Sequence, residues 1–97
     1  MVKLPIIVRR VEGRSMEPTL RTGRLVIATQ KFASIDKGML VIANVKSREI
    51  IKRVSEIKDK KVYLLGDNPN ESTDSRSLGW VDVNAILGVV IWPRPKS

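Results

Sequence analysis

The sequence Glu49-Ile50-Ile51-Lys52-Arg53-Val54-Ser55-Glu56 is typical of a β-strand whose two faces differ. Successive side chains of a strand point to opposite sides of the sheet, so Ile50, Lys52 and Val54 share one face. That face is apolar except for Lys52, whereas Arg53 points away from it and keeps its charge. We therefore expect a lysine amine on the apolar side of a sheet.

On either side of this strand the chain continues as β-branched runs separated by turns. No stretch of ten or more residues keeps a helical period of 3.6. The sequence predicts an all-β fold, either a small antiparallel coiled sheet or a partly open barrel. We expect strands at residues 6–11, 24–28, 39–45, 49–57, 62–65, 80–83 and 85–92, with a hairpin connection over residues 44–48 and a turn at Asp59-Lys60.

Length and composition restrict the possible classes of protein. Ninety-seven residues suffice for a single domain with one modest core, which we expect to span residues 1–97 with 93–97 as a loose tail. There is no cysteine, so disulfides and thiolate chemistry are excluded, and no histidine, so a transition-metal site is not expected. We expect no metal and no cofactor.

The net charge of +8 favours acidic partners or an anionic membrane surface. Nucleic acid is not an expected partner, because the basic residues are scattered and no recognition motif is present. Trp80 and Trp92 are either partly buried or help a basic surface to associate peripherally with lipid headgroups. No apolar run approaches the ~20 residues that span a bilayer. We expect a soluble chain, cytoplasmic or peripheral at the membrane.

The stretch Gly13-Arg14-Ser15-Met16-Glu17-Pro18-Thr19-Leu20 places a serine in a turn. A serine nucleophile needs a base, and without histidine the remaining arrangement is a serine-lysine pair. Lys52 is the candidate, because burial lowers the pKa of a lysine and makes it a base near neutral pH. Two alternatives stay open: Ser15 is only a turn residue, or Lys52 extends its ammonium to water.

A polar loop of fourteen residues, 66–79, is unusually long for so small a domain. Such a loop is either functional or a solvated excursion rich in turn-forming residues. Its polar side chains are Asp67, Asn68, Asn70, Ser72, Thr73, Asp74, Ser75 and Arg76.

Four motifs in order resemble the type I signal peptidase family. They are Gly13-x-Ser15-Met16-x-Pro18-Thr19-Leu20, Ile51-Lys52-Arg53-Val54, Gly66-Asp67-Asn68-x-x-x-Ser72-x-Asp74-Ser75-Arg76-x-x-Gly79 and Ile91-Trp92-Pro93. The resemblance implies a serine endopeptidase with an all-β catalytic core. Its partner would be a precursor protein whose N-terminal leader binds as an extended strand, with small side chains before the cut.

The resemblance also implies roles for single residues. Ser15 would be the nucleophile, Lys52 the general base and Ser72 a hydroxyl that orients the lysine. The turn at Gly13 and the N–H of Ser15 would stabilise an oxyanion. Structural support of the site would come from Arg53, Asp67, Asn68, Asp74, Ser75 and Arg76, in part as ion pairs.

The chain also departs from the family pattern. Gly23-Arg24 and Gly38-Met39 stand where Gly-Asp is common, and Gly13 stands where some lineages have a second hydroxyl donor. The membrane anchor and the accessory β domain of the family do not occur in these residues. This small form resembles the nickel-type superoxide dismutase maturation proteases. Two alternatives remain, a self-cleaving regulator of the LexA type and a non-catalytic peptide-binding module.

Overall fold

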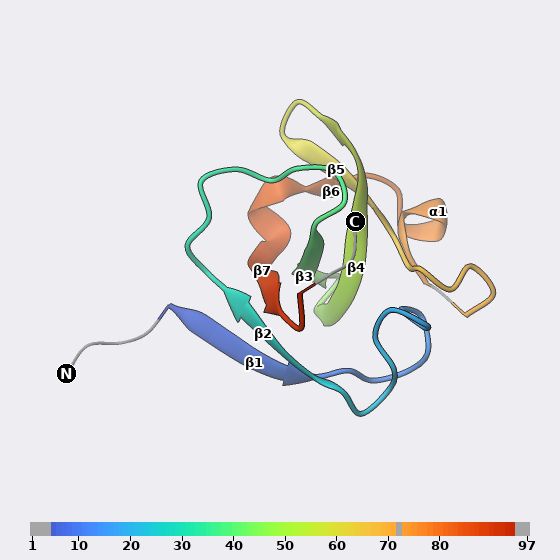
Figure 1. Cartoon of the computed structure of the whole chain (residues 1–97). Helices are drawn as coiled ribbons and strands as arrows, with labels where there is room; N and C mark the ends of the chain where they lie inside the picture. The colour runs from blue at the N-terminus through green and yellow to red at the C-terminus, as the bar shows by residue number, and fades with distance from the viewer. Residues whose placement is uncertain (1–4, 72, 95–97) are drawn as a thin grey trace.

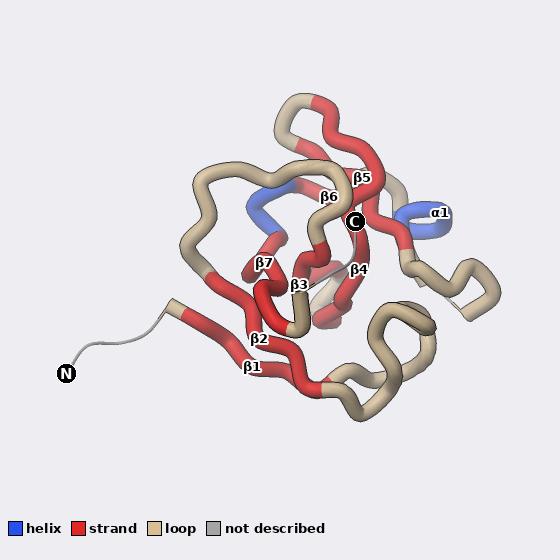
Figure 2. The backbone as a smooth tube through the Cα atoms, in the orientation of Figure 1, coloured by secondary structure: helices blue, strands red, loops and turns tan. Residues whose placement is uncertain are grey.

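The computed structural model describes residues 5–71 and 73–94 and forms one antiparallel sheet (Figure 1). The strands are ordered β1-β2-β7-β3-β4-β5-β6 and the sheet coils without closing (Figure 2), which confirms the predicted all-β class. Their bounds are β1 Ile6–Arg10, β2 Leu25–Thr29, β3 Leu40–Val45, β4 Arg48–Lys58, β5 Lys61–Leu65, β6 Val81–Asp82 and β7 Ile86–Trp92.

Two short hairpins build the centre of the sheet. The β3–β4 connection consists of Lys46 and Ser47 alone, with φ of 52° and 64°. Positive φ at both central residues is the requirement of the tight turn whose twist matches that of the flanking strands. The hairpin is therefore shorter than the predicted connection over residues 44–48. The β4–β5 turn lies at Asp59-Lys60, as predicted.

The second half of the chain differs from the predicted strands in three places. The long loop contains a short helix, α1 (Ser75–Leu78), because the Asp74 side chain caps it by accepting a hydrogen bond from the N–H of Arg76. The predicted strand over residues 80–83 reduces to β6. Its continuation is a 3₁₀ turn, Val83–Ala85, so that β7 begins one residue later than predicted.

Apolar side chains cover both faces of β3 and form two clusters. Leu40 and Ile42 belong to one cluster, and Val41 and Ala43 belong to the other. The first cluster also contains Met16 and Leu20 from the loop between β1 and β2, and its other buried members are Val11, Val26, Ala28 and Val90. That loop is therefore fixed to the core by its own side chains. Within the described residues, no helix has the length and apolarity needed to cross a membrane.

Candidate active site

Ser15 lies in the loop between β1 and β2, at the point where this loop turns. Gly13 has φ of +78°, a conformation that favours glycine, and a Cβ there would meet nothing within 4 Å. Directly after Ser15, Met16 is 1% exposed, and its carbonyl accepts a 2.8 Å hydrogen bond from the N–H of Leu20. Buried anchors immediately after the serine hold its turn in place.

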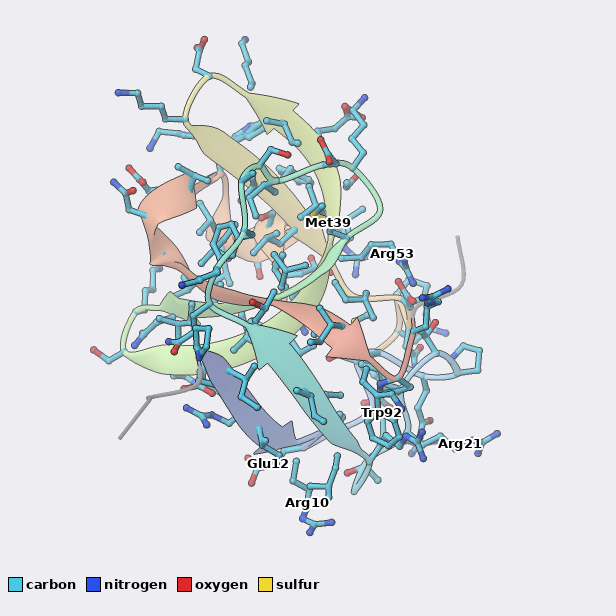
Figure 3. The ribbon with its side chains drawn as sticks, turned by 60° about the vertical axis from the view of Figure 1, so that its left-hand side comes forward. Arg10, Glu12, Arg21, Met39, Arg53 and Trp92 are labelled. Atoms are coloured by element: carbon cyan, nitrogen blue, oxygen red, sulfur yellow. The ribbon has the colours of Figure 1, made fainter. Side chains whose placement is uncertain are left out.

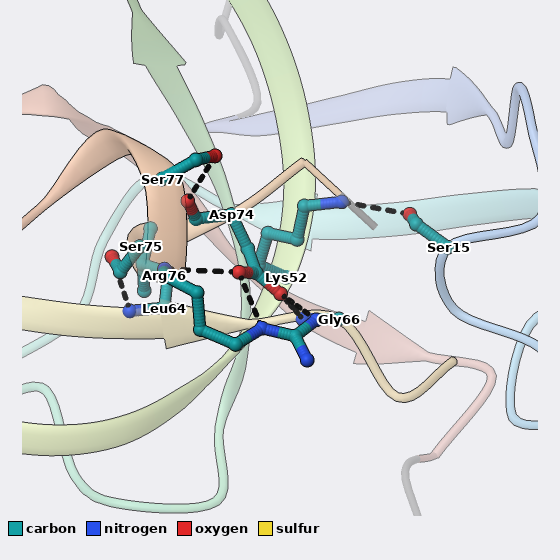
Figure 4. A network of polar contacts seen from close by, with 8 residues as sticks. All are labelled: Ser15, Lys52, Leu64, Gly66, Asp74, Ser75, Arg76 and Ser77. Atoms are coloured by element: carbon teal, nitrogen blue, oxygen red, sulfur yellow. Dashed lines mark hydrogen bonds and ion pairs between the residues drawn. The ribbon is translucent and has the colours of Figure 1, made fainter. Parts of the chain in front are cut away.

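Lys52 lies on the apolar face of β4 predicted from the strand period. The residue is only 4% exposed, and its neighbour on that face, Val54, is 1% exposed. The Nζ atom is 2.8 Å from the Oγ atom of Ser15, which is hydrogen-bond distance (Figure 4). The alternative in which Lys52 extends its ammonium to water is therefore wrong.

The surroundings of Lys52 favour its neutral amine. Burial lowers the pKa of Lys52 below its ordinary value, because the ammonium loses its hydration. The carboxylate of Asp74 opposes this change, and the guanidinium of Arg76 adds to it. The net direction is downward, which is the direction that a general base working near neutral pH requires.

Arg53, the next residue of β4, points to the other face and binds Asp67. Its Nε and Nη2 atoms donate to the two carboxylate oxygens of Asp67, each at 2.9 Å, and Nη1 donates to the carbonyl of Gly38 at 2.8 Å. The hydroxyl of Thr19 also donates to Asp67. Burial alone would raise the pKa of Asp67, but these hydrogen bonds outweigh burial and lower it. The Asp67 carboxylate thus ties β4 to the end of the Ser15 loop.

A second polar cluster, centred on Asp74, lies on the side of Lys52 away from Ser15 (Figure 4). Asp74 is 1% exposed and accepts hydrogen bonds from the main-chain N–H groups of Gly66 and Arg76 and from the Arg76 guanidinium, at 2.8 to 3.0 Å. Ser75 is 2% exposed, and its Oγ accepts a 2.8 Å bond from the N–H of Leu64 in β5. These bonds fix the two ends of the long loop to each other.

Asn68 joins the long loop to the Ser15 turn. Its main-chain N–H donates to the carbonyl of Ser15 at 2.8 Å, and its side-chain Nδ2 donates to the carbonyl of Arg14 at 3.0 Å. The structure thus brings three of the four motifs quoted from the sequence together around Ser15 and Lys52, whereas Ile91-Trp92-Pro93 lies apart, with Trp92 against Arg24. The dyad-orienting role expected of Ser72 falls on a residue outside the described part of the chain.

The sequence did not predict two interactions near the site, the Thr19–Asp67 hydrogen bond and the Arg9–Glu49 ion pair. Thr19 belongs to a quoted motif but was given no role, because only the fold brings it to Asp67. Arg9 and Glu49 form an ion pair between β1 and β4, 40 residues apart, and no sequence signal indicated this pair.

A groove of about 570 Å³ runs past Ser15 and Lys52. Residues 9–16 form one wall and residues 48–52 of β4 form the other, and the Arg9–Glu49 ion pair connects the two walls.

The groove wall formed by β4 has an unpaired edge. β3 pairs with all of residues 48–53, but β5 pairs with β4 only from Arg53 onward. In the described structure, residues 48–52 therefore have a strand neighbour on one side only. Main-chain groups alternate in direction along an antiparallel strand, so Glu49 and Ile51 direct their N–H and C=O groups away from β3.

Comparisons with known proteins support the family expected from the motifs. The profile of the family described as Peptidase S24-like matches residues 3–91. The chain is 32% identical to mitochondrial inner membrane protease subunit 1 of Xenopus tropicalis and 33% identical to those of Homo sapiens and Mus musculus. Each alignment covers 84% of this chain but 66% of the relative, so the chain spans just under two thirds of these relatives. Because the profile match runs over most of its length, the chain belongs to the Peptidase S24-like family.

Proposed function

We propose that the protein is a serine endopeptidase of the signal peptidase type, with Ser15 as nucleophile and Lys52 as general base. The observation that carries the proposal is the 2.8 Å distance between Nζ and Oγ combined with the burial of Lys52. A buried amine beside a serine hydroxyl has the geometry and the lowered pKa that proton abstraction needs.

The proposed reaction has two steps. The Ser15 O–H gives its proton to the neutral Lys52 amine as Oγ attacks the peptide carbonyl carbon, and the tetrahedral intermediate then expels the leaving amine, which takes the proton from the Lys52 ammonium. An acyl ester on Ser15 remains. In the second step Lys52 takes a proton from water, the water oxygen attacks the ester carbonyl, and Oγ leaves with that proton.

The substrate that we propose is a precursor protein whose leader adds to the free edge of β4. An extended peptide on residues 48–52 would gain main-chain hydrogen bonds from Glu49 and Ile51 and would pass beside Ser15. Removal of an N-terminal leader follows from the resemblance stated above. The precursor of a nickel superoxide dismutase is the first substrate to test, because the small branch that the chain resembles acts on it.

The proposed chemistry is tested without knowledge of the substrate by intact-mass analysis after exposure to a serine-acylating probe of the penem class. We expect a single adduct, located at Ser15 by peptide mapping and absent from Ser15→Ala. The pH range should extend from about 6 to 10, which covers a lysine with a lowered or an ordinary pKa. An adduct on another serine, or none throughout this range, contradicts the proposal.

We also propose that the outer face of β1 and β2 contacts an anionic lipid surface. Val8 on β1 is 48% exposed, and Leu25 on β2 is 43% exposed. Trp92, at the end of β7, is 48% exposed, and the guanidinium of Arg24 lies 4.8 Å from the centre of its ring. Arg10 shares the face of Val8, and Figure 3 shows it toward the same end of the molecule as Trp92. Apolar and indole groups bordered by arginines suit the interface of an anionic membrane.

Binding to vesicles of phosphatidylglycerol and phosphatidylcholine tests this face. We expect Val8→Asp and Trp92→Ala each to weaken binding by about tenfold, because each removes apolar burial in the interface. Trp80→Ala is the matched control, since Trp80 is 43% exposed but packs on Tyr63 away from this face. Equal losses in both tryptophan variants would mean that this face is not the specific lipid contact, and no loss in either would mean that charge alone drives binding. A dimer in light scattering that Val8→Asp abolishes would assign the face to a second copy of the chain instead.

A further inference from the structure

Asn68 holds both peptide groups that flank Ser15. Its Nδ2 donates to the carbonyl of Arg14, and its main-chain N–H donates to the carbonyl of Ser15, at 3.0 and 2.8 Å. Two hydrogen bonds from one residue to consecutive carbonyls define the orientation of the backbone at that point. The side-chain bond acts on the peptide group that contains the Ser15 N–H.

That peptide group is trans, because the two cis peptide bonds of the described residues precede Pro18 and Pro93. In a planar trans peptide the C=O and the N–H point in opposite directions. When Asn68 draws the Arg14 carbonyl toward the long loop, the Ser15 N–H must point the other way. Ser15 lines the groove, and among the described residues its N–H donates no main-chain hydrogen bond.

We propose that Asn68 is a positioning residue that aims the Ser15 N–H at the developing oxyanion. This inference rests on the proposed function and adds a role that Ser15 and Lys52 cannot fill. An oxyanion donor stabilises the transition state only if its direction is fixed in advance. The Ser15 N–H needs such fixing because Gly13, two residues earlier, allows the backbone of this turn many conformations. Gly13 has φ of +78° and open space around it.

The position of Asn68 is fixed relative to β4, the strand that carries Lys52. Its chain neighbour Asp67 is bound by both nitrogens of the Arg53 fork, and Arg53 follows Lys52 directly on β4. On one face of β4, Lys52 contacts the Oγ atom of Ser15. On the other face, Arg53 holds Asp67, and the neighbouring Asn68 in turn holds the Arg14–Ser15 peptide group. The Lys52 amine and the Ser15 N–H are therefore both positioned by β4, as a preorganised site requires.

The test compares Asn68→Leu with wild type by the rate of acylation with the penem probe, measured over probe concentration and pH. Leucine has nearly the shape of asparagine but cannot donate, and the main-chain N–H at position 68 remains. We expect the maximal acylation rate to fall between about 10- and 100-fold. The concentration for half-maximal rate and the pH midpoint should not change, because Asn68 contacts neither the probe nor Lys52. Asn70→Leu, an exposed asparagine of the same loop, is the matched control and should match wild type.

Three results would overturn the inference. The first is an unchanged maximal acylation rate. The second is a lower rate together with a moved pH midpoint, which would mean that Asn68 acts through Lys52. The third is a lower rate that only follows the fraction of unfolded protein. A second measurement does not depend on activity: the amide NMR signal of Ser15 should shift in Asn68→Leu and stay in place in Asn70→Leu. An unmoved Ser15 signal would refute the positioning role even where the wild type is not acylated, whereas absent wild-type acylation refutes the proposed function.

Discussion

Lys52→Met is expected to lower the rate of Ser15 acylation by at least about 10³-fold while the sheet remains folded. Methionine fills the space of the lysine stem on the buried face of β4 but has no lone pair strong enough to take the Ser15 proton. The measurement is the rate of the penem adduct by intact mass. Lys58→Met, on the exposed end of the same strand, is the control and should leave the rate unchanged. Near-normal rates in Lys52→Met at neutral pH would disprove the dyad.

The same variant should be more stable than wild type at neutral pH. Burial lowers the pKa of Lys52 in the folded state, so below that pKa folding must carry a buried ammonium. The unfolded chain binds the extra proton more readily between the two pKa values, and stability therefore rises with pH there. Lys52→Met removes this cost, and its advantage in the free energy of unfolding should shrink as the pH rises toward the ordinary lysine pKa. Urea unfolding at several pH values measures the trend.

Asp74→Ala is expected to lower the free energy of unfolding by about 3 kcal/mol. The buried carboxylate accepts from the main-chain N–H groups of Gly66 and Arg76, and alanine leaves both donors without this acceptor. The loss of the Arg76 side-chain bond contributes less, because that side chain is 44% exposed and can turn to water. Urea unfolding followed by tryptophan fluorescence measures the change.

Asp82→Ala is the matched control for stability. Asp82 also caps a short helical turn, with one 2.7 Å bond from the N–H of Asn84, but it is exposed. Its loss should cost about 1 kcal/mol or less. If the two alanine variants were equally stable, the buried Asp74 network would not hold the long loop.

Asp74→Asn tests the electrostatic effect of the Asp74 carboxylate on Lys52. The charge of Asp74 raises the pKa of Lys52 against the larger effect of burial. Removing the charge while keeping the shape should therefore lower the pKa of Lys52 further and move the pH midpoint of acylation to lower pH. A midpoint that stays or moves upward would show that Asp74 acts only on structure.

Local pattern was sufficient for the strands near the centre of the sheet. The period of two in residues 49–56 predicted the buried face of Lys52, because alternation is a property of the extended backbone itself. The turn at Asp59-Lys60 was predicted for a similar reason, since aspartate favours turns in any context. The class of the fold followed from the succession of such runs.

Local pattern failed where distant partners decide the conformation. The helix α1 lies in a stretch without helical period and exists because Asp74, itself buried by the fold, caps its first turn. The side chains of residues 80, 83 and 85 predicted strand, but β5 pairs only with Val81 and Asp82. Pairing, which links residues far apart in the chain, overrode propensity.

The absence of histidine and the strand period were enough to select Lys52 as the candidate base, because composition and alternation are properties of the chain alone. The distance of 2.8 Å between Nζ and Oγ was decided by tertiary structure, since it depends on the burial of Met16 and on the contacts of Asn68 and Asp67. The bonds of Asn68 to the Ser15 turn and of Thr19 to Asp67 join segments 48 to 54 residues apart in the sequence. Only the packing of the complete sheet brings such segments together, because no local interaction acts over that separation.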